Sequence, residues 1–448
     1  MLLIYSEKDS PRLRYITKML FEVILGAEYE IVIISNGSSA TKVKSAGNPS
    51  LFYGINEPGM ISIPDEGLLF EDDVREKEVR IEDGDIPKIR FSDRRTDGFS
   101  IDFDIFSSAF YLVTQYGYYY HSLSFDSHGR YNEQANKDIL PYGKPAVDMY
   151  AACLWELLKT RYPGIKRKEN LFDYQITFDI DAPYLYRHKG LFLSLASLFK
   201  KVIKLKFLSA VQKIKALAGG KDPYDVYDYI IDRVPVQKLL FFFLINRKSP
   251  YDGWHTFKNK AYRKLIKKIS RARIRVGIHP SYDSFMDRDM IKSETGELKK
   301  IIKKPVTSSR MHFLKYRLPH TFSYLQRAGI ENDYTLCPIN STGFKSFISR
   351  SYYWYDLKRN QETNLMIHPT MIMDRTLQRY MRLTPAKALD EIKRMIDVTY
   401  SYNGLFTILF HNNSLSETGE WKGWKMVFEN TILYLSAKKA KLEGEIAP

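Results

Sequence analysis

Two aspartates at the end of an apolar segment are the clearest candidates for chemistry in this sequence. The segment Ile176–Asp181 reads Ile-Thr-Phe-Asp-Ile-Asp, so Asp179 and Asp181 are two residues apart. Side chains alternate along a strand, which would direct both carboxylates to one face. Two neighbouring carboxylates repel each other, and this favours a bound cation or a shared proton. The spacing suits a metal ligand beside a general base, and the alternative is a pair of acids that begins a polar loop.

A histidine at the end of another apolar segment is the second candidate. Val276–His279 reads Val-Gly-Ile-His, and Asp283 follows four residues later. If the chain turns helically there, His279 and Asp283 share a face and reach one cation. Imidazole and carboxylate ligands together suit zinc or another divalent first-row ion. The alternative is a capping or surface pair, which is common at this spacing.

Two more segments end in side chains that could act on a substrate. His411 follows the strongly apolar run Leu405–Phe410, where it is well placed as a general acid. Its alternative is a buried, hydrogen-bonded structural histidine. Arg310, in the sequence Arg-Met-His-Phe-Leu, could orient a carboxylate through its fork of donors. Its alternative is an ordinary surface arginine.

The elements that must position these residues alternate along the chain from Asp173 onward. Short apolar runs are followed by helical stretches, which indicates an α/β unit, and closure into a barrel is one solution. In barrels of parallel strands the chemistry collects at the carboxyl ends of the strands, where the candidates stand. The expected strands are 174–178, 239–245, 274–278, 310–314, 333–336 and 405–410. The expected helices are 257–272, 319–328, 385–400 and 423–437.

The N-terminal part differs in charge and forms a smaller predicted α/β domain. Met1–Arg161 carries 18 Lys and Arg against 25 Asp and Glu, whereas the remaining chain carries 50 against 27. Such asymmetry indicates two units with different surfaces. Tyr162-Pro163-Gly164 ends a predicted helix, so we place the domains at 1–165 and 166–448. The expected N-terminal strands are 2–5 and 30–35, and the expected helices are 11–25, 104–119 and 146–158.

A basic insert at about 185–235 interrupts the strand–helix alternation. Ala182–Lys221 contains nine Lys and Arg and neither Asp nor Glu. Residues 189–221 could rest on an anionic membrane surface as basic amphipathic helices. The alternative is a helical hairpin that packs on the barrel with a solvated basic face. The positive charge would also suit nucleic acid, but the sequence has no recognisable nucleic-acid motif, so we expect no nucleic-acid partner.

Composition and cysteine usage predict a cytoplasmic protein. Hydrophobic residues make up 44% and charged residues 27%, which argues against extensive disorder. No segment approaches the ~18 apolar residues of a membrane span, and the N-terminus lacks the pattern of a secretory signal. Two cysteines, Cys153 and Cys337, fit a reducing compartment. If the basic insert binds lipid, the protein would be peripheral to the inner membrane.

The joint order of the candidate segments resembles the polysaccharide deacetylases, also called the NodB-homology or family-four carbohydrate esterases. Thr177–Asp181 looks like the family's Thr-Phe-Asp-Asp motif in the form with one residue between the acids. His279 matches the first histidine of the His-(Ser/Thr)-x-x-His motif, and Asp283 stands where the second is expected. The resemblance spans about 173–435 and implies an irregular (β/α) barrel that follows the smaller N-terminal domain.

The resemblance also implies roles for individual residues. Asp179 would be the catalytic base, Arg310 would tether it, and His411 would protonate the leaving amine. The metal ligands would be Asp181, His279 and Asp283. The fourth motif contains an Asp and a Trp, for which Asp374 and Asp356 beside Trp354 are candidates. The substrate contacts would come from His312, Lys345, Trp354 and Asp374.

A closer likeness is to a bacterial subgroup in which the barrel follows an uncharacterised N-terminal domain. Ser10–Ile16, Asp126–Tyr131 and Arg310–Leu314 are among the segments that look like this subgroup. A Gly-Phe-Arg-Ala-Gly-Thr segment is usual there, whereas this chain has Gly343-Phe344-Lys345. Lysine lacks the bidentate fork of arginine, so the substrate would be positioned differently.

The activity implied by the resemblance is metal-dependent removal of an N-acetyl or O-acetyl group from a bacterial polysaccharide or glycan precursor. The cofactor would be a divalent metal, with zinc favoured. The substrate would be an N-acetylated glycan or a lipid-linked or nucleotide sugar precursor. The alternative, motivated by Asp283 and Lys345, is a catalytically inert barrel that binds carbohydrate or assists glycan assembly.

Overall fold

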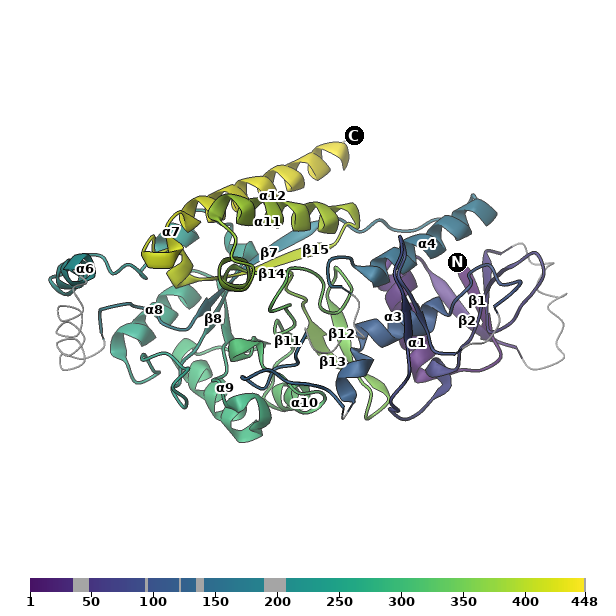
Figure 1. The fold of residues 1–448 in the computed structure, drawn as a ribbon, viewed down its shortest axis with the longest axis horizontal. Helices are drawn as coiled ribbons and strands as arrows, with labels where there is room; N and C mark the ends of the chain where they lie inside the picture. Colours follow the sequence, from purple (N-terminus) through teal and green to yellow (C-terminus); the bar gives the residue numbers. More distant parts are fainter. Residues whose placement is uncertain (35–47, 93–95, 121, 134–140, 189–206, 447–448) are drawn as a thin grey trace. The chain divides into compact units, whose positions relative to one another are not determined.

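The chain folds into two compact units in the computed structural model (Figure 1). The structure describes residues 1–448 except 35–47, 93–95, 121, 134–140, 189–206 and 447–448. The first unit contains Met1–Phe172, Gly343–Pro369 and Ser401–Leu405. The second unit contains Asp173–Thr342, Thr370–Tyr400 and Phe406–Pro448.

The first unit is built on a parallel sheet of four strands in the order β2-β1-β3-β4. Asp104 caps α3 by accepting a hydrogen bond from the Ser107 backbone N–H, and every residue of α3 is buried. The expected helix over 11–25 continues past α1 as a π-helix over Lys18–Ile24. The main elements are β1 (Leu2–Ser6), β2 (Tyr29–Ile33), β3 (Ser50–Tyr53), β4 (Ile61–Ile63), α1 (Pro11–Thr17), α3 (Ile105–Val113) and α4 (Ala146–Arg161). The antiparallel hairpin of β5 (Arg80–Glu82) and β6 (Lys88–Arg90) completes this part.

Two later segments of the chain return to the first unit, although the sequence places them in the domain 166–448. The longer one, Gly343–Pro369, contains the antiparallel hairpin of β12 (Tyr352–Asp356) and β13 (Gln361–Ile367). Buried and half-buried polar contacts fix it within this unit. Asp148 accepts hydrogen bonds from the backbone N–H and the hydroxyl of Ser349, and Lys18 pairs with Glu362. Such contacts join residues far apart in sequence, which local patterns do not reveal.

The second unit contains a sheet whose strands run in the order β11-β10-β9-β8-β7-β15-β14. The neighbouring pairs β7–β8, β8–β9, β9–β10, β10–β11 and β14–β15 are parallel. The strands are β7 (Asp173–Ile180), β8 (Leu239–Phe243), β9 (Arg275–Ile278), β10 (Ser308–Ser309), β11 (Asn332–Asp333), β14 (Ile372–Met373) and β15 (Leu405–His411). The expected α/β class is confirmed. Among the described residues, no strand pairing between β11 and β14 is seen.

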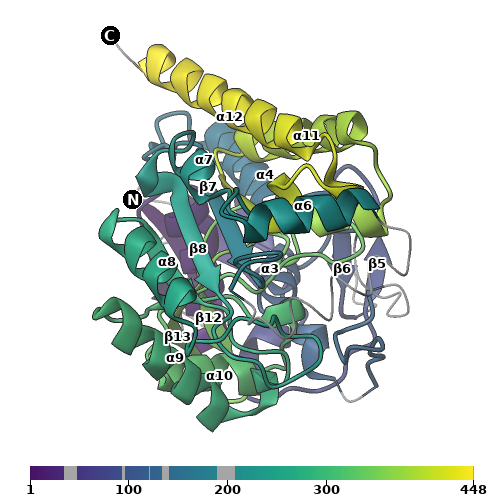
Figure 2. The ribbon, with the colours of Figure 1, turned by 90° about the vertical axis from the view of Figure 1, so that its left-hand side faces the viewer.

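Continuous apolar sequence explains the central strands of this sheet. All five residues of β8 are buried, as is usual when a parallel strand is covered on both faces. Helix α8 packs against β9 and α9, and α9 packs against α10. Helices α11 and α12 lie side by side in both ribbon views (Figures 1 and 2). These helices are α8 (Lys260–Arg271), α9 (Arg288–Ile302), α10 (His320–Arg327), α11 (Pro385–Ser401) and α12 (Trp424–Ile446).

One expected strand is wrong, and the difference matters for the site. Residues 310–314 do not form a strand, because β10 ends at Ser309 and a short 3-10 turn covers His312–Leu314. Phe313 and Leu314 have φ values of 59° and 56°, so the backbone enters the left-handed region there. The apolar residues of this segment therefore line a tight turn at the end of β10.

The basic insert is described only in part. Residues 189–206 lie outside the described residues, while α6 (Phe207–Leu217) and α7 (Tyr227–Ile231) follow them. Among the described residues, no helix combines the length and the apolar character needed to cross a membrane.

Candidate metal and catalytic site

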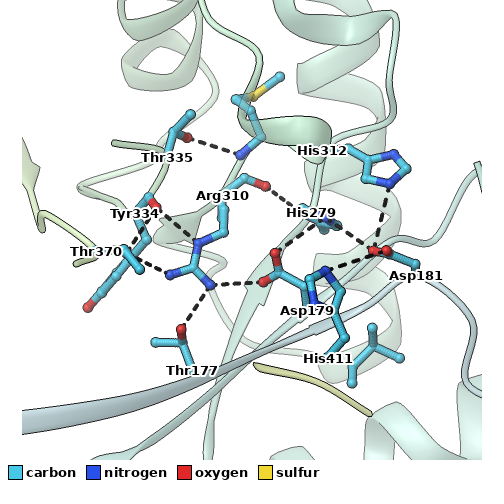
Figure 3. A network of polar contacts seen from close by, with 12 residues as sticks. Thr177, Asp179, Asp181, His279, Arg310, His312, Tyr334, Thr335, Thr370 and His411 are labelled. Carbon is cyan, nitrogen blue, oxygen red and sulfur yellow. Dashed lines mark hydrogen bonds and ion pairs between the residues drawn. The ribbon is translucent and has the colours of Figure 1, made fainter. Parts of the chain in front are cut away.

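Five candidate residues of the second unit meet at the carboxyl ends of its strands (Figure 3). Asp179 and Asp181 come from the end of β7, and His279 follows the last residue of β9. Arg310 follows β10, and His411 ends β15. Because neighbouring parallel strands end at the same edge, residues far apart in sequence are brought together there.

Two of these side chains, Asp181 and His279, form a group with His312 that could hold a metal ion. Asp181, His279 and His312 each offer one ligand atom, and these atoms lie within 4.8 Å of one another. The Asp181 Oδ1 is 3.3 Å from the His279 Nε2 and 3.8 Å from the His312 Nε2. This buried oxygen accepts no hydrogen bond from any described residue. A buried carboxylate oxygen without a hydrogen bond, which faces two imidazole nitrogens, makes a donor set that fits a divalent cation such as zinc.

The far side of each imidazole ring is fixed by an acceptor. The His279 Nδ1 contacts the backbone carbonyl of Arg310, and the His312 Nδ1 lies 3.0 Å from the Asp252 Oδ1. A carbonyl or carboxylate oxygen can only accept, so we assign the proton to Nδ1 in both rings. Each Nε2 then faces Asp181 and offers its lone pair on that side when a cation replaces its proton. This is the orientation that a histidine needs to ligate a metal.

Asp252 is itself held firmly. It accepts hydrogen bonds from the backbone N–H groups of Tyr282, Lys248 and Ser249. Burial lowers the pKa of His312, but the carboxylates of Asp181 and Asp252 outweigh burial and raise this pKa to about 9. The negative field that favours a proton on this ring would equally favour a cation beside it.

Burial and the surrounding imidazoles act on Asp181 in opposite directions. Burial raises its pKa, but the neighbouring His312, His279 and His411 together lower this pKa well below its usual range. The Asp181 carboxylate is therefore ionised at neutral pH, as a metal ligand must be.

Asp179 is paired with a fully buried arginine. The Arg310 Nη1 donates to the Asp179 Oδ1 at 2.9 Å and to the Thr177 Oγ1 at 2.9 Å. Its remaining donors reach the Tyr334 carbonyl at 2.9 Å and the Thr370 Oγ1 at 3.0 Å. These bonds satisfy the buried guanidinium and fix the Asp179 carboxylate. The other oxygen of this carboxylate, Oδ2, lies 3.6 Å from the His279 Nε2, beside the ligand group.

His411 faces the other carboxylate oxygen of Asp181 and is held by Asp374. The Asp374 Oδ1 is 2.7 Å from the His411 Nδ1, and its Oδ2 accepts the His411 backbone N–H at 2.6 Å. The His411 Nε2 lies 3.8 Å from the Asp181 Oδ2. Burial lowers the pKa of His411, but the charge of Asp374 outweighs burial and raises this pKa to about 9. The ring is therefore protonated at neutral pH and can donate a proton from Nε2.

The structure places Asp283 outside this group. Its side chain is exposed, and the atom expected from it is supplied by His312. The helical turn needed to align Asp283 with His279 does not form, because α9 begins only at Arg288. His312, expected as a substrate contact, is instead brought to Asp181 by the turn after β10.

Lys345 and Trp354, also expected as substrate contacts, belong to the first unit. Lys345 is buried and its Nζ is 2.6 Å from the Glu133 Oε1. Trp354 is a buried residue of β12. Both side chains therefore pack inside the first unit. Asp374, expected in the same set, contacts His411 as described above.

Sequence reasoning missed Asp252. It belongs to the loop after β8, which is one of the strand ends where the α/β pattern predicts chemistry. The signal was an acid between two aromatics in Tyr251-Asp252-Gly253-Trp254. Only the fold brings this loop beside His312, because the two lie 60 positions apart.

Comparison with known proteins gives one family match and several structural likenesses. Residues 2–163 match a family of unknown function, DUF7033. No curated protein matches the chain.

Three solved structures illustrate the likenesses in fold. A protein described as a polysaccharide deacetylase from Mycobacterium smegmatis is 14% identical, with a TM-score of 0.37, covering 63% of this chain and 93% of that one. Agd3, described as a novel carbohydrate deacetylase, is 8% identical, with a TM-score of 0.36, covering 98% of this chain and 87% of that one. A CE4 family pseudoenzyme from Bacillus anthracis is 12% identical, with a TM-score of 0.30, covering 60% of this chain and 63% of that one.

Proposed function

We propose that this protein is a metal-dependent carbohydrate deacetylase that hydrolyses an N-acetyl or O-acetyl group of a glycan or glycan precursor. One observation carries the proposal. The ligand group of Asp181, His279 and His312 lies beside both an arginine-held carboxylate, Asp179, and an aspartate-held imidazole, His411. A base and an acid next to a cation site are the parts that amide hydrolysis requires.

The residues of the chain divide the reaction between them. A bound divalent cation would be held by Asp181, His279 and His312, and it would supply Lewis-acid polarisation of the acetyl carbonyl and of water. Asp179 accepts the proton of the attacking water at Oδ2, because its Oδ1 is engaged by Arg310. His411 donates a proton from Nε2 to the departing nitrogen or oxygen. The products are acetate and a sugar with a free amine or hydroxyl.

Zinc is the metal that we propose. Two imidazole nitrogens and one carboxylate oxygen are a common ligand set for catalytic zinc, with a fourth position left for water or substrate. The substrate that we propose is an N-acetylated glycan or a lipid-linked or nucleotide sugar precursor in the bacterial cytoplasm. We further propose that the protein contacts an anionic membrane through 189–221.

The test of this function is acetate release from an N-acetylated oligosaccharide by protein loaded with zinc. We expect activity that is lost with chelator, returns with zinc, and falls by at least about 100-fold in Asp179→Asn. His320→Ala, a change in α10 outside the site, serves as a matched histidine control for His279→Ala. Activity that persists in Asp179→Asn and His279→Ala would contradict the proposal.

A catalytically inert sugar-binding or glycan-assembly protein is the alternative function. The observation that favours it concerns Lys345, which stands where the subgroup has an arginine that we expected to contact substrate. In this structure Lys345 belongs to the first unit and pairs there with Glu133. Stoichiometric zinc binding without acetate release from any of several N- and O-acetylated glycans would support this alternative.

A further inference from the structure

The loop that follows β8 touches two of the three candidate metal ligands. Asp252 bonds the His312 ring, as described above. The next residue, Gly253, lies so close to the Asp181 backbone that an added Cβ would be 1.8 Å from the Asp181 carbonyl oxygen. His255 turns inward as well and is buried. The loop is therefore anchored beside the ligand group by residues on its inner side.

The two residues that flank Asp252 and Gly253 are large aromatics that are about half exposed to solvent. Tyr251 is 51% exposed and Trp254 is 52% exposed. Burial of the apolar surface of tryptophan and tyrosine is favourable in free energy. Two half-exposed aromatic side chains beside a buried polar site therefore indicate a surface that binds a ligand. The other four tryptophans of the chain, Trp155, Trp354, Trp421 and Trp424, are at most 7% exposed.

Aromatic contacts connect exposed Tyr251 to the ligand His312. The centre of the Tyr251 ring lies 4.4 Å from the centre of the Tyr282 ring and 5.5 Å from that of the Phe313 ring. The centre of the Phe313 ring is in turn 4.9 Å from the centre of the His312 ring. Tyr251 thus continues a wall of rings that begins at the candidate metal site.

Trp254 is held in a defined orientation. The Arg247 guanidinium stacks 3.4 Å from the centre of the indole ring, an arrangement that is favourable because the ring face is electron-rich. The stacked arginine restricts the ring while about half of its surface stays exposed. A preformed surface of this kind costs little conformational entropy when a ligand binds.

We propose that Tyr251 and Trp254 form an aromatic platform that binds a pyranose ring of the glycan, next to the sugar that carries the acetyl group. A pyranose has an apolar C–H face and a polar rim, and the apolar face complements the electron-rich face of an aromatic ring. The platform rests on the proposed function for its ligand class, and it predicts an oligosaccharide of at least two sugars as the substrate.

The exposure difference among the tryptophans provides a direct test. The experiment uses full-length Asp179→Asn protein loaded with zinc and titrated with chitohexaose, a neutral N-acetylated oligosaccharide. We expect chitohexaose to protect the exposed tryptophan from quenching by acrylamide, and we expect this protection to saturate as the ligand concentration rises. Trp254→Phe in the same background should abolish this protection. Trp254→Ala and Tyr251→Ala should each weaken chitohexaose binding about 3- to 10-fold, the size of one aromatic contact.

Controls separate this platform from a general effect on folding. Tyr353→Ala removes an aromatic of the first unit that is 39% exposed, and it should leave binding unchanged. In protein with Asp179 intact, Trp254→Ala should raise KM for chitohexaose and leave kcat within twofold. Unchanged melting temperatures would exclude unfolding.

Two results would overturn the platform, and neither depends on catalysis. One is chitohexaose binding, measured by calorimetry, that leaves Trp254 emission and its quenching unchanged. The other is no binding of chitohexaose at all. Acetate release with no response of Trp254 would overturn the platform and keep the deacetylase. A Trp254 response without acetate release from any acetylated glycan would keep the platform and remove the deacetylase.

Discussion

At the scale of single residues, the site depends on partners that are not themselves reactive. Asp252 and the Arg310 carbonyl set the proton positions of the two candidate ligand histidines, and Asp374 does so for His411. Five of the residues that meet there, Asp179, Asp181, His279, Arg310 and His411, could be predicted from strand-end motifs. His312 as a ligand and Asp252 as its support could not be, because their contact depends on a turn and a loop with no helical or strand period.

The third metal ligand can be tested by comparing two substitutions. His312→Ala should weaken zinc binding by more than the 10- to 100-fold that loss of an outer partner typically causes. Asp283→Ala should leave zinc affinity unchanged, because the Asp283 side chain is exposed and outside the ligand group. Competition of each apoprotein with a fluorescent zinc chelator measures both constants. Equal losses in the two variants would contradict this assignment.

The pH dependence of the reaction should depend on Asp374. Its charge raises the pKa of His411 against the opposing effect of burial, so Asp374→Asn should lower that pKa. His411 would then lose its proton at a lower pH, and the alkaline limb of the kcat profile should move to lower pH by at least about one unit. Rates measured between pH 6 and 10 test this. An unchanged alkaline limb would mean that His411 is not the acid.

At the scale of elements, loops rather than strands complete the site. The strand–helix alternation and most element positions could be predicted, because apolar period and length define them locally. The expected strand over 310–314 failed because its apolar residues face the core from a turn. A strand and a tight turn can carry the same pattern of apolar residues over 310–314, so the sequence alone does not distinguish the two conformations.

The close approach of the β8 loop to Asp181 gives an element-scale prediction. Gly253→Ala would place a Cβ against the Asp181 backbone carbonyl, so either the loop or the ligand must shift. We expect a lower melting temperature and at least about tenfold weaker zinc binding.

Gly296 in α9 provides the matched control for this substitution. An added Cβ there meets no atom within 4 Å. Gly296→Ala should therefore stabilise the protein by up to ~1 kcal/mol through helix propensity, with zinc affinity unchanged. Calorimetry and chelator competition on both variants would measure this difference. Wild-type zinc affinity in Gly253→Ala would show that the loop does not position Asp181.

At the scale of the whole molecule, positive charge is concentrated in the larger unit. A groove of about 910 Å³ is lined by six Lys and Arg side chains of α8 and by Arg187. The acidic residues that line the same groove are Asp225 and Asp228. In the neighbouring insert, Val211, Ile214 and Leu217 of α6 are 45% to 53% exposed. The charge asymmetry was readable from composition. The division of the chain into two units was readable only in part, because Gly343–Pro369 returns to the first unit.

The basic groove along α8 and the exposed apolar residues of α6 predict binding to anionic membranes. We expect sedimentation with vesicles of phosphatidylcholine and phosphatidylglycerol that weakens as salt rises, and no sedimentation with phosphatidylcholine alone. Lys264→Glu with Lys267→Glu on α8 should reduce the bound fraction severalfold. Lys292→Glu with Lys299→Glu makes the same charge change on α9 and should have less effect. Equal losses in the two double variants would indicate a response to net charge alone.

The enclosure of Arg310 has a consequence for how this site could change over time. Its guanidinium holds Asp179, while its own main-chain oxygen contacts the ring of His279. A shift of the backbone at this one position would therefore misplace the proposed proton acceptor and a proposed cation ligand in a single event. Arg310→Lys separates the two duties, because it removes the fork and keeps the carbonyl. A lineage that abandoned hydrolysis through a side-chain replacement here could still retain its ion, and would leave a binding protein as the descendant of an enzyme.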